Sequence, residues 1–323
     1  MKHTTLGTLD VSRLGLGTMG MSAFYSGAGT DDAESTRTIR RALDLGVTFF
    51  DTAEMYGPYI NEELLGKALG SDRDSVVVAT KGGTLKHLDD DSYGLDGRPA
   101  NLRIALEGSL KRLGTDHVDL YYQHRMDPSV PIEDTVGAMA DFVAEGKILG
   151  YGLSEAAPAR IVAAHAVHPI TAVQTEYSLW SRDPEDELLP LLRELGIGFV
   201  PYSPLGRGFL TGALRSVDQL DESDFRRNSP RFRGENLKQN LAIVDAVESV
   251  AAEVGATSAQ VALAWILAQG EGIAPIPGTK RVSRLEENVA ADALTLTDDQ
   301  LAVLNGLPKP AGDRYADMSS VNR

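Results

Sequence analysis

Short apolar runs, rich in β-branched and aromatic residues, alternate along this chain with longer stretches whose apolar residues recur at helical spacing. The short runs predict eight strands, at Arg13–Gly17, Val47–Phe50, Val76–Thr80, Val118–Gln123, Gly150–Leu153, Ala172–Gln174, Gly198–Pro201 and Gly272–Ile276. The longer stretches predict helices between them, among them Ala33–Leu45, Leu102–Leu113, Ile132–Glu145, Glu187–Leu195 and Leu241–Val254. Strands that alternate with helices are typical of a parallel sheet with crossover helices.

The number of strand–helix units bears on how the sheet closes. An open doubly wound sheet also fits the alternation, but eight units over 323 residues, with no linker or shift in composition, favour a closed barrel. We therefore expect an α/β fold with one domain over residues 1–323, a (β/α)8 TIM barrel that begins with a β-hairpin at Lys2–Asp10. Two long segments follow strand ends and are expected as loops on the catalytic face: Gly82–Ala100, which is polar, and Gly206–Asn236, which is rich in Gly, Arg and Phe.

A glycine-rich stretch after the first strand offers a different interpretation. Gly15–Gly20 matches G-x-G-x-x-G, which in a dinucleotide-binding unit runs directly into a helix whose N-terminus holds the pyrophosphate. Here Met21–Gly29 intervenes before the helical pattern begins, so the phosphates would have no helix N-terminus. We interpret the stretch as a tight strand end, at which Gly17, Thr18 and Met19 border a ligand.

Composition narrows the classes of partner. The chain carries 46 acidic and 31 basic residues, a formal charge of −15, so we expect it to bind neither nucleic acid nor a membrane surface. It has no cysteine, which excludes disulfides, thiolate metal sites and a cysteine nucleophile. The first residues lack the apolar region of a signal peptide, and we expect a cytoplasmic protein with a small-molecule substrate. A homo-oligomer is left open.

Four polar residues stand at or just after the ends of consecutive predicted strands. Asp51 ends the second strand and Tyr56 follows in the same loop, while Lys81 and His124 close the third and fourth strands. Because the carboxyl ends of parallel barrel strands share one face, these side chains are expected to converge there. Polar groups at the ends of strongly apolar strands are costly unless they are paired.

The four side chains suit the reduction of a carbonyl group. Hydride attack on C=O builds an alkoxide that needs a proton, and a free tyrosine, with a pKa of about 10, is a weak acid for this step. A Lys81 ammonium would lower the pKa of Tyr56, and Asp51 would hold that ammonium in place. His124 would donate a hydrogen bond to the substrate oxygen.

Each of the four residues taken alone also fits a structural role, as a rim aromatic, a surface lysine, a core histidine or a helix N-cap. Their coincidence on one predicted face favours the catalytic interpretation. A metal site is not expected, because the six histidines are scattered and no carboxylate cluster has ligand spacing. A serine hydrolase is not expected either, because the chain has no G-x-S-x-G elbow.

These residues resemble the motifs of the aldo-keto reductase family, and the resemblance covers essentially the whole chain. Gly46–Gly57 closely matches the family's Asp/Tyr motif, Ala79–Lys81 its lysine strand and Tyr121–Arg125 its histidine strand. The resemblance implies an NAD(P)H-dependent oxidoreductase that reduces aldehydes or ketones to alcohols. It implies a catalytic tetrad with a tyrosine as general acid, made of Asp51, Tyr56, Lys81 and His124.

The resemblance also implies which residues bind the cofactor. Ser154 and Gln174 are similar to the residues that bind the carboxamide, and the stretch after the seventh predicted strand resembles the pyrophosphate loop. The expected set comprises Gly17, Thr18, Met19, Asp51, Ser154, Gln174, Tyr202, Ser203, Pro204, Leu205, Gly206, Gly278, Thr279, Lys280, Arg284, Glu287 and Asn288. Phosphate contacts after the last two strands fit the usual phosphate site of such barrels.

One departure from the family bears on the choice of cofactor. Many members carry a lysine where this chain has Gly278, and that lysine contacts the 2′-phosphate of NADP(H). Thr279, Lys280 or Arg281, with Arg284, would replace it, since a guanidinium binds phosphate bidentately. The alternative is that Lys280 and Arg281 only begin a solvated helix. We expect NADPH in preference to NADH, and no metal.

Substrate recognition is expected from the loops. Phe24, Tyr25 and Trp180 are expected to wall an apolar pocket, although such aromatics can also only pack the loops. Arg125, beside His124, is expected to bind either a polar group of the substrate or a structural carboxylate.

Two other functions stay open at this point. One is a cofactor-binding regulatory subunit with slow or vestigial reductase activity, like the potassium-channel β-subunits that are similar to this family. The other is a barrel lyase or isomerase that needs no nicotinamide. Turnover of NADPH with a reactive aldehyde separates the first from a reductase, and failure to bind NADPH or NADH would favour the second.

Overall fold

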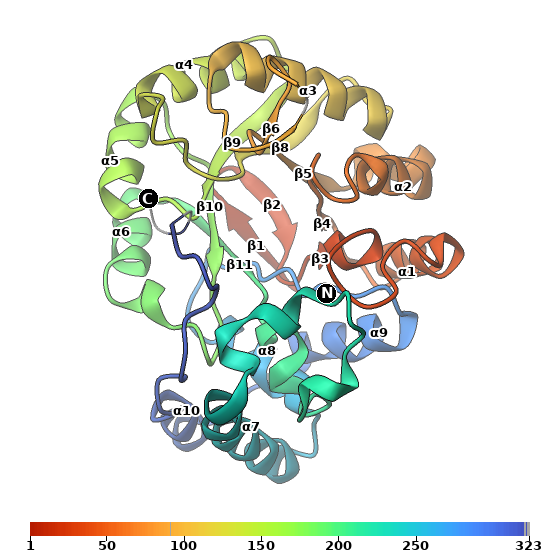
Figure 1. Ribbon diagram of the computed structural model, residues 1–323, viewed down its shortest axis with the longest axis vertical. Helices are drawn as coiled ribbons and strands as arrows, with labels where there is room; N and C mark the ends of the chain where they lie inside the picture. The colour runs from red at the N-terminus through yellow and green to blue at the C-terminus, as the bar shows by residue number, and fades with distance from the viewer. Residues whose placement is uncertain (91, 320, 322–323) are drawn as a thin grey trace.

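Parallel strands form a barrel at the centre of the structure, and helices surround it (Figure 1). The structure, a computed structural model, describes residues 1–90, 92–319 and 321. Within these residues one parallel sheet holds seven strands in the order β11-β10-β9-β8-β5-β4-β3. They are β3 (Leu16–Gly17), β4 (Phe49–Asp51), β5 (Val77–Gly82), β8 (Val118–Gln123), β9 (Ile148–Ser154), β10 (Ala172–Glu176) and β11 (Gly198–Tyr202). Each overlaps a predicted strand, and the predicted TIM barrel is confirmed.

The eighth predicted strand, Gly272–Ile276, closes the barrel between β11 and β3 but is not a regular strand. On the β11 side Phe199 N donates to the carbonyl of Gly272 at 2.8 Å, and on the β3 side Gly15 N donates to that of Pro275 at 3.0 Å. Pro275 and Pro277 have no N–H with which to return hydrogen bonds to β3, so the ladder on that side is incomplete. The prediction of a regular strand here is therefore wrong.

Helices connect the strands and cover the outside of the barrel (Figure 1). They are α1 (Asp32–Asp44), α2 (Ile60–Leu69), α3 (Pro99–Leu113), α4 (Ile132–Ala144), α5 (Pro158–Val167), α6 (Leu188–Leu195), α7 (Gly234–Val254), α8 (Ser258–Leu267), α9 (Val282–Ala290) and α10 (Asp298–Asn305). The five helices predicted by range are confirmed, but α7 begins at Gly234 rather than Leu241. Its first turns are polar, and only Leu237 and Asn240 there are buried, so the apolar period starts later than the helix.

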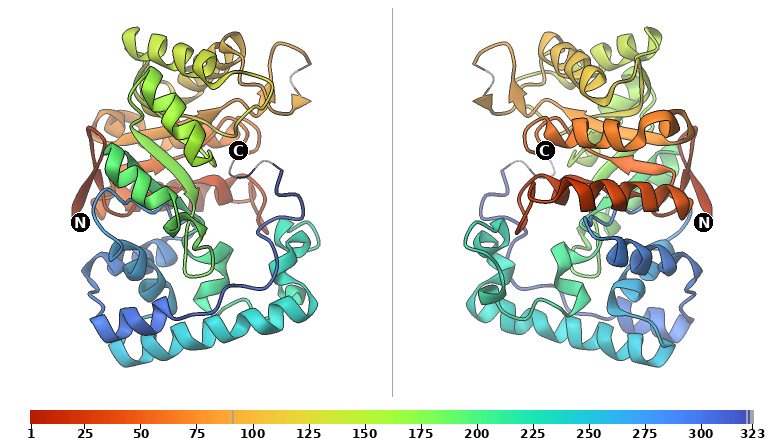
Figure 2. Two further views of the ribbon diagram at one scale, coloured as in Figure 1. Left: turned by 90° about the vertical axis from the view of Figure 1, so that its left-hand side faces the viewer. Right: turned by 90° about the vertical axis from the view of Figure 1, so that its right-hand side faces the viewer.

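The predicted N-terminal hairpin closes the bottom of the barrel. It consists of β1 (His3–Leu6) and β2 (Leu9–Ser12), which pair antiparallel, and its Leu6 and Val11 are fully buried in a cluster with strand residues such as Phe49. Figure 2 shows the hairpin at one end of the barrel and the long loops at the other. Because this core fills one end of the barrel, the site lies at the other end, at the carboxyl ends of the strands.

Both long segments fold over those carboxyl ends, as predicted (Figure 2). The first forms a small hairpin of β6 (Leu85–Lys86) and β7 (Ser92–Tyr93), and the second contains the short 3-10 helices η4 (Gly206–Thr211), η5 (Val217–Gln219), η6 (Phe225–Asn228) and η7 (Pro230–Phe232). After α10 the chain runs up across the same end (Figure 2). Among the described residues no single helix is long and apolar enough to cross a membrane; one pair, α7 with α8, passes on length and composition together but is bent by 90°.

Candidate active site

An ammonium–carboxylate pair lies at the adjoining ends of β4 and β5. Lys81 is fully buried and Asp51 is 2 % exposed, and the Lys81 Nζ donates a hydrogen bond to Asp51 Oδ1. Nζ also donates to the carbonyl of Thr52 at 2.8 Å, while the other carboxylate oxygen accepts from Gln174 Nε2 at 2.8 Å. Because both charges are paired and hydrogen-bonded, they can remain ionised inside the barrel.

The phenol of Tyr56 takes the third hydrogen bond of the same ammonium. Lys81 Nζ lies 3.2 Å from the Tyr56 hydroxyl oxygen and 5.0 Å from the centre of its ring. The His124 ring meets the Tyr56 ring edge-on, with centroids 5.8 Å apart. The structure thus brings together the four residues that the sequence predicts, from three consecutive strand ends.

Charge and burial act on these groups in opposite directions. Burial raises the pKa of Tyr56 above its usual value of 10, by more than the Lys81 ammonium lowers it. Burial lowers the pKa of Lys81, but Asp51 and Tyr56 raise it by more, so the ammonium keeps its proton. The sequence correctly indicated the direction of the Lys81 effect on Tyr56, but the net shift is upward because the phenol is enclosed.

His124 is held in its neutral form. Burial, and then the charges of Arg125 and Lys81, lower the pKa of His124 well below its usual value of 6.5. Its Nδ1 is buried without a hydrogen-bond partner, whereas Nε2 is not fully buried. A neutral imidazole can direct one N–H toward a substrate oxygen.

One residue that the sequence interpretation missed ties the loops of the site together. Asn61, fully buried at the start of α2, donates to the carbonyl of Thr18 at 2.9 Å and to Ser22 Oγ at 2.8 Å. Its side-chain oxygen accepts from the hydroxyls of Thr18 and Thr52, the latter at 2.7 Å. Asn61 thereby fixes the loop after β3 to the loop that follows Asp51. Asn61 and Glu62 are buried polar residues at the start of a helix whose other buried residues are apolar, and this pair was the available signal.

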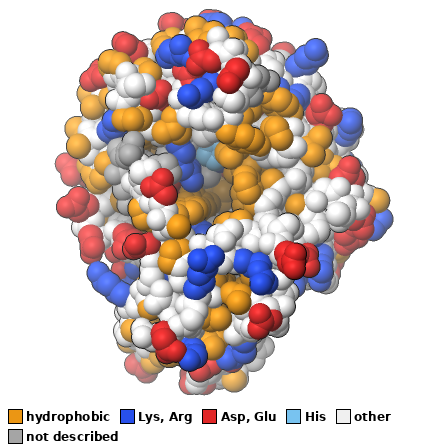
Figure 3. Space-filling view, viewed as in Figure 1, with side chains coloured by type: hydrophobic (Ala, Val, Ile, Leu, Met, Phe, Trp, Pro, Cys, Tyr) orange, Lys and Arg blue, Asp and Glu red, His pale blue; other side chains and the backbone are white. Residues whose placement is uncertain are grey.

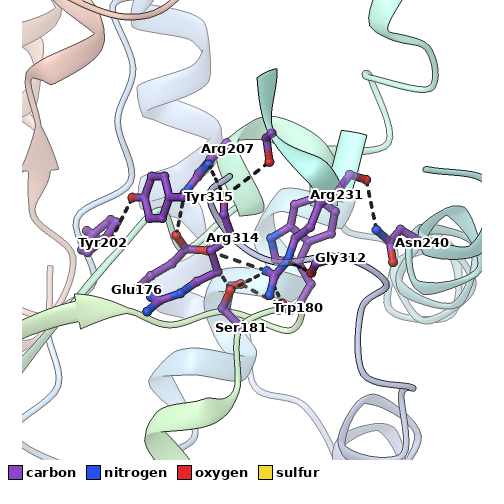
Figure 4. A network of polar contacts seen from close by, with 12 residues as sticks. Glu176, Trp180, Ser181, Tyr202, Arg207, Arg231, Asn240, Gly312, Arg314 and Tyr315 are labelled. Carbon is purple, nitrogen blue, oxygen red and sulfur yellow. Dashed lines mark hydrogen bonds and ion pairs between the residues drawn. The ribbon is translucent and has the colours of Figure 1, made fainter. Parts of the chain in front are cut away.

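A buried ionic network lies beside the strand ends and anchors the C-terminal segment (Figure 4). Arg314 binds both carboxylate oxygens of Glu155 at 3.1 Å, and Arg207 binds Glu176 at 2.9 Å and the carbonyl of Arg314 at 3.1 Å. Arg231 donates to Ser181 Oγ at 2.7 Å. Segments far apart in sequence therefore meet at the mouth of the barrel, which the sequence interpretation did not anticipate.

The expected substrate residues occupy different environments. Phe24 is 42 % exposed, and Tyr25 packs edge-on against Phe225 with ring centroids 5.2 Å apart. Trp180 does not wall an open pocket: it is 1 % exposed and stacks on Phe209 at 4.3 Å between centroids, so this expectation is wrong. On the face viewed in Figure 3, apolar side chains border a hollow in which basic side chains and a histidine are visible.

Comparison with known proteins identifies the family. The aldo/keto reductase family model matches residues 13–308. The chain belongs to the aldo/keto reductase family. It is accordingly an oxidoreductase, and its family uses a nicotinamide cofactor.

Solved aldo/keto reductases share the fold over nearly the whole chain. The glycerol dehydrogenase of Gluconobacter oxydans is 29 % identical with a TM-score of 0.85, and the alignment covers 94 % of each chain. A thermostable aldo-keto reductase solved with the inhibitor epalrestat is 32 % identical with a TM-score of 0.77, covering 95 % of this chain and 100 % of that one. An aldo/keto reductase of Klebsiella pneumoniae, solved with NADP and acetate, is 28 % identical with a TM-score of 0.74, covering 98 % and 99 %.

The residues at the ends of β9 and β10 fit the amide of a nicotinamide ring. Ser154 and Gln174 are direct neighbours in the parallel register of these strands. Gln174 uses its amide nitrogen on Asp51, which leaves its oxygen as an acceptor, and Ser154 supplies a hydroxyl that can donate or accept. A primary amide has one donor group and one acceptor, so this pair can hold it.

The loop after β11 has four residues in the left-handed backbone region, and two of their N–H groups, of Gly206 and Gly208, donate to carbonyls within the loop. Ser203, Gly206, Arg207 and Gly208 all have positive φ angles, of 49°, 56°, 59° and 89°. Positive φ is costly for a serine or an arginine and is typical of functional loops, where successive N–H groups can face an anion. The expected pyrophosphate loop, from Tyr202 to Gly206, lies in this stretch.

The residues expected at the adenosine end are only partly free. Lys280 Nζ donates to the carbonyls of Ser26, at 2.9 Å, and Gly27, which engages the cation with the loop after β3. Thr279 is buried and accepts from Arg281 N at 3.1 Å at the start of α9. Arg284 is exposed on α9 and makes no hydrogen bond or ion pair with a described residue. Of the predicted phosphate ligands, Arg284 and Arg281 retain the most free donors, since neither guanidinium makes a hydrogen bond or ion pair with a described residue.

Three further expected cofactor residues, Gly17, Gly278 and Asn288, lie where the barrel closes. A Cβ on Gly17 would come within 2.9 Å of the carbonyl of Ile276, so glycine is required for β3 to approach that segment. Gly17 and Gly278 form a parallel bridge, and Asn288 is buried on α9. Met19 starts the short 3-10 helix η1 (Met19–Met21), next to Thr18.

Proposed function

We propose that the protein is an NADPH-dependent reductase that converts aldehydes or ketones to alcohols, with Tyr56 as the general acid. The observation that carries the proposal is the 3.2 Å contact between the Tyr56 hydroxyl and the Lys81 ammonium, which is itself held by Asp51. The contact joins a proton donor to a fixed positive charge at the carboxyl ends of the strands. There a substrate would meet the cofactor.

When bound, the nicotinamide supplies the hydride that reduces the carbonyl carbon. The neutral His124 would orient the carbonyl oxygen by donating a hydrogen bond from Nε2. Tyr56 would pass its proton to that oxygen as negative charge builds on it, and Lys81 would stabilise the tyrosinate that is left. Asp51 would keep Lys81 charged and positioned through the step.

In the reverse direction the same residues would remove a proton from an alcohol. A glycerol dehydrogenase is among the structurally similar proteins, and oxidation of an alcohol is the microscopic reverse of the proposed step. Tyr56 would then act as the base, assisted by the same ammonium.

The preference for NADPH is part of the proposal. The similar Klebsiella pneumoniae protein was solved with NADP, and exposed Arg281 and Arg284 stand at the start of α9 with guanidinium groups suited to a 2′-phosphate. Glu34 Oε1 accepts from Val282 N at 3.3 Å at the same helix end, so a bound phosphate would compete with this carboxylate. We also propose that the whole chain acts as one barrel domain, since one family model covers residues 13–308.

Turnover of the cofactor tests the proposal. Purified protein with NADPH and a reactive aldehyde such as 4-nitrobenzaldehyde is expected to consume NADPH and form the alcohol over many turnovers. A protein that binds NADPH tightly but oxidises less than one equivalent per chain would instead be a regulatory subunit. A protein that binds neither nicotinamide cofactor would overturn the assignment.

A further inference from the structure

One half-buried cation at the mouth of the barrel has no anionic partner among the described residues. Arg125 directly follows His124, and its Nη1 donates to the His124 carbonyl at 2.7 Å and to Ser154 Oγ at 3.0 Å. No carboxylate of the described residues forms an ion pair with it. Its Nε and Nη2 have no hydrogen-bond partner among those residues, and neither atom is fully buried. Three N–H groups of the guanidinium are therefore free, and two of them lie on the edge formed by Nε and Nη2.

The neighbouring arginines differ from Arg125 in this respect. Arg314 holds both oxygens of Glu155, and Arg207 is divided between Glu176 and a backbone carbonyl. Arg231 forms an ion pair with Glu176 at 3.9 Å and also donates to a serine hydroxyl and to carbonyls, that of Trp180 lying 2.6 Å away. These three cations maintain the fold of the loops. The local carboxylates are thus already bound, and none is left for Arg125.

The position of Arg125 relates it to the reacting atoms. It follows the histidine that would orient the carbonyl oxygen, it lies close enough to Tyr56 to lower the pKa of that phenol, and its guanidinium carbon lies 5.9 Å from the centre of the Tyr202 ring. Its hydrogen bonds to a main-chain carbonyl and to Ser154 hold the group rigidly, so its free edge is presented with little loss of entropy on binding. A solvated surface arginine would have neither property.

We propose that Arg125 is a substrate-binding residue that selects carbonyl compounds carrying an anionic group, a carboxylate or a phosphate. The proposal rests on the reductase function proposed above and specifies its substrate class. Nε–H and Nη2–H form the fork that binds two oxygens of one anion, and the surrounding excess of positive charge strengthens that bond in a partly buried site. The anion neutralises Arg125 while the carbonyl reaches Tyr56 and His124.

Matched pairs of charged and neutral substrates test the proposal. With NADPH, the pairs are 4-oxobutanoate against its methyl ester, and glyceraldehyde 3-phosphate against glyceraldehyde. The wild type is expected to show a higher kcat/KM for the charged member of at least one pair, by roughly ten- to hundredfold. The pair that shows the preference identifies the carboxylate or the phosphate as the recognised group.

Substitution of Arg125 should abolish the preference rather than only slow the enzyme. In R125Q the ratio of kcat/KM between charged and neutral members is expected to fall to near one, mainly through KM for the charged member. R125K should keep part of it, because a lysine retains the charge without the fork. R103Q, which changes an exposed arginine paired with Glu145 on the outer helices, should leave the ratio as in the wild type.

Two results would overturn the proposal. One is a wild type with no preference in either pair, and the other is an R125Q variant that loses activity equally on charged and neutral substrates, which would make Arg125 a positioning residue for Ser154. Calorimetry of benzoate binding, with benzamide as the uncharged control, adds a readout that needs no turnover. If the protein reduces no aldehyde, binding of benzoate that is lost in R125Q would uphold the anion site while the reductase proposal fails.

Discussion

The ammonium of Lys81 donates all three of its N–H groups, to Asp51, the carbonyl of Thr52 and the hydroxyl of Tyr56. A lysine with three acceptors in a buried site has no freedom to reorient. The position of the Lys81 ammonium next to the Tyr56 hydroxyl is therefore set by the backbone of β4 and β5. It does not depend on a bound substrate.

Removing this cation should affect both activity and stability. In Lys81→Met, kcat/KM for reduction is expected to fall by roughly 10²- to 10⁴-fold, since Tyr56 loses the charge that stabilises its anion. Denaturant titration should show a loss of about 3–5 kcal/mol in the free energy of unfolding, because Asp51 is left buried and unpaired. Adding Asp51→Asn should restore most of the stability but not the activity. Equal stability of the single and double variants would contradict the pairing.

The pH dependence of reduction should lack an ionisation at the usual pKa of histidine. The pKa of His124 lies well below 6.5, so the ring is neutral throughout the range above that value. The pKa of Tyr56 is raised above 10, so the phenol keeps its proton until the pH exceeds that value, and reduction is lost only beyond it. A profile of kcat/KM is thus expected to be flat from about pH 6.5 to 9. An acid limb centred near 6.5 that disappears in His124→Ala would refute this account.

The discrimination between cofactors should depend on Arg284. Arg284→Ala is expected to raise the Kd of NADPH by roughly tenfold or more, because a guanidinium–phosphate bond is lost, and to change the Kd of NADH by less than about twofold. Fluorescence titration measures both constants, and Arg103→Ala, on α3 and paired with Glu145, serves as the control. An equal loss for the two cofactors would remove the argument from the 2′-phosphate.

The hydrogen bonds by which Asp224 joins its loop to the loop of Ser26 should slow the exchange of cofactor. Asp224 accepts hydrogen bonds from Ser26 N at 2.9 Å and from the Arg226 side chain at 2.7 Å, and these bonds keep the pKa of Asp224 below its usual range. Asp224→Asn is expected to speed dissociation of NADPH several-fold in stopped-flow fluorescence, because the charge-assisted bonds between the loops weaken. The matched variant Asp245→Asn, which loosens only an exposed pair with Arg215, should dissociate at the wild-type rate. Identical rates in the two variants would mean that the hydrogen bonds of Asp224 do not limit the release of NADPH.

The sequence predicted the barrel and the four central residues because both leave local signals. Apolar runs mark strands, and a polar residue at the end of such a run has to be paired, as Asp51 and Lys81 are. The incomplete eighth strand depended on Pro275 and Pro277, whose missing N–H groups matter only once β3 is known to be the neighbour.

The ionic network could not be predicted in the same way. Arg314 and Glu155 are 159 residues apart, and nothing near either residue indicates that the C-terminal segment returns to the mouth of the barrel. The burial of Trp180 follows from that network and the loop around Phe209, so its aromatic character alone was misleading. The engagement of Lys280 by two carbonyls also depends on a loop far away in sequence.

The claim that Tyr56 donates the proton is tested most directly by Tyr56→Phe, measured as kcat for reduction of 4-nitrobenzaldehyde together with the Kd of NADPH. The variant keeps the ring and its packing and removes only the hydroxyl that lies 3.2 Å from Lys81. The account predicts an unchanged Kd and a kcat lower by at least about 10²-fold. A variant that reduces the aldehyde at the wild-type rate would contradict it.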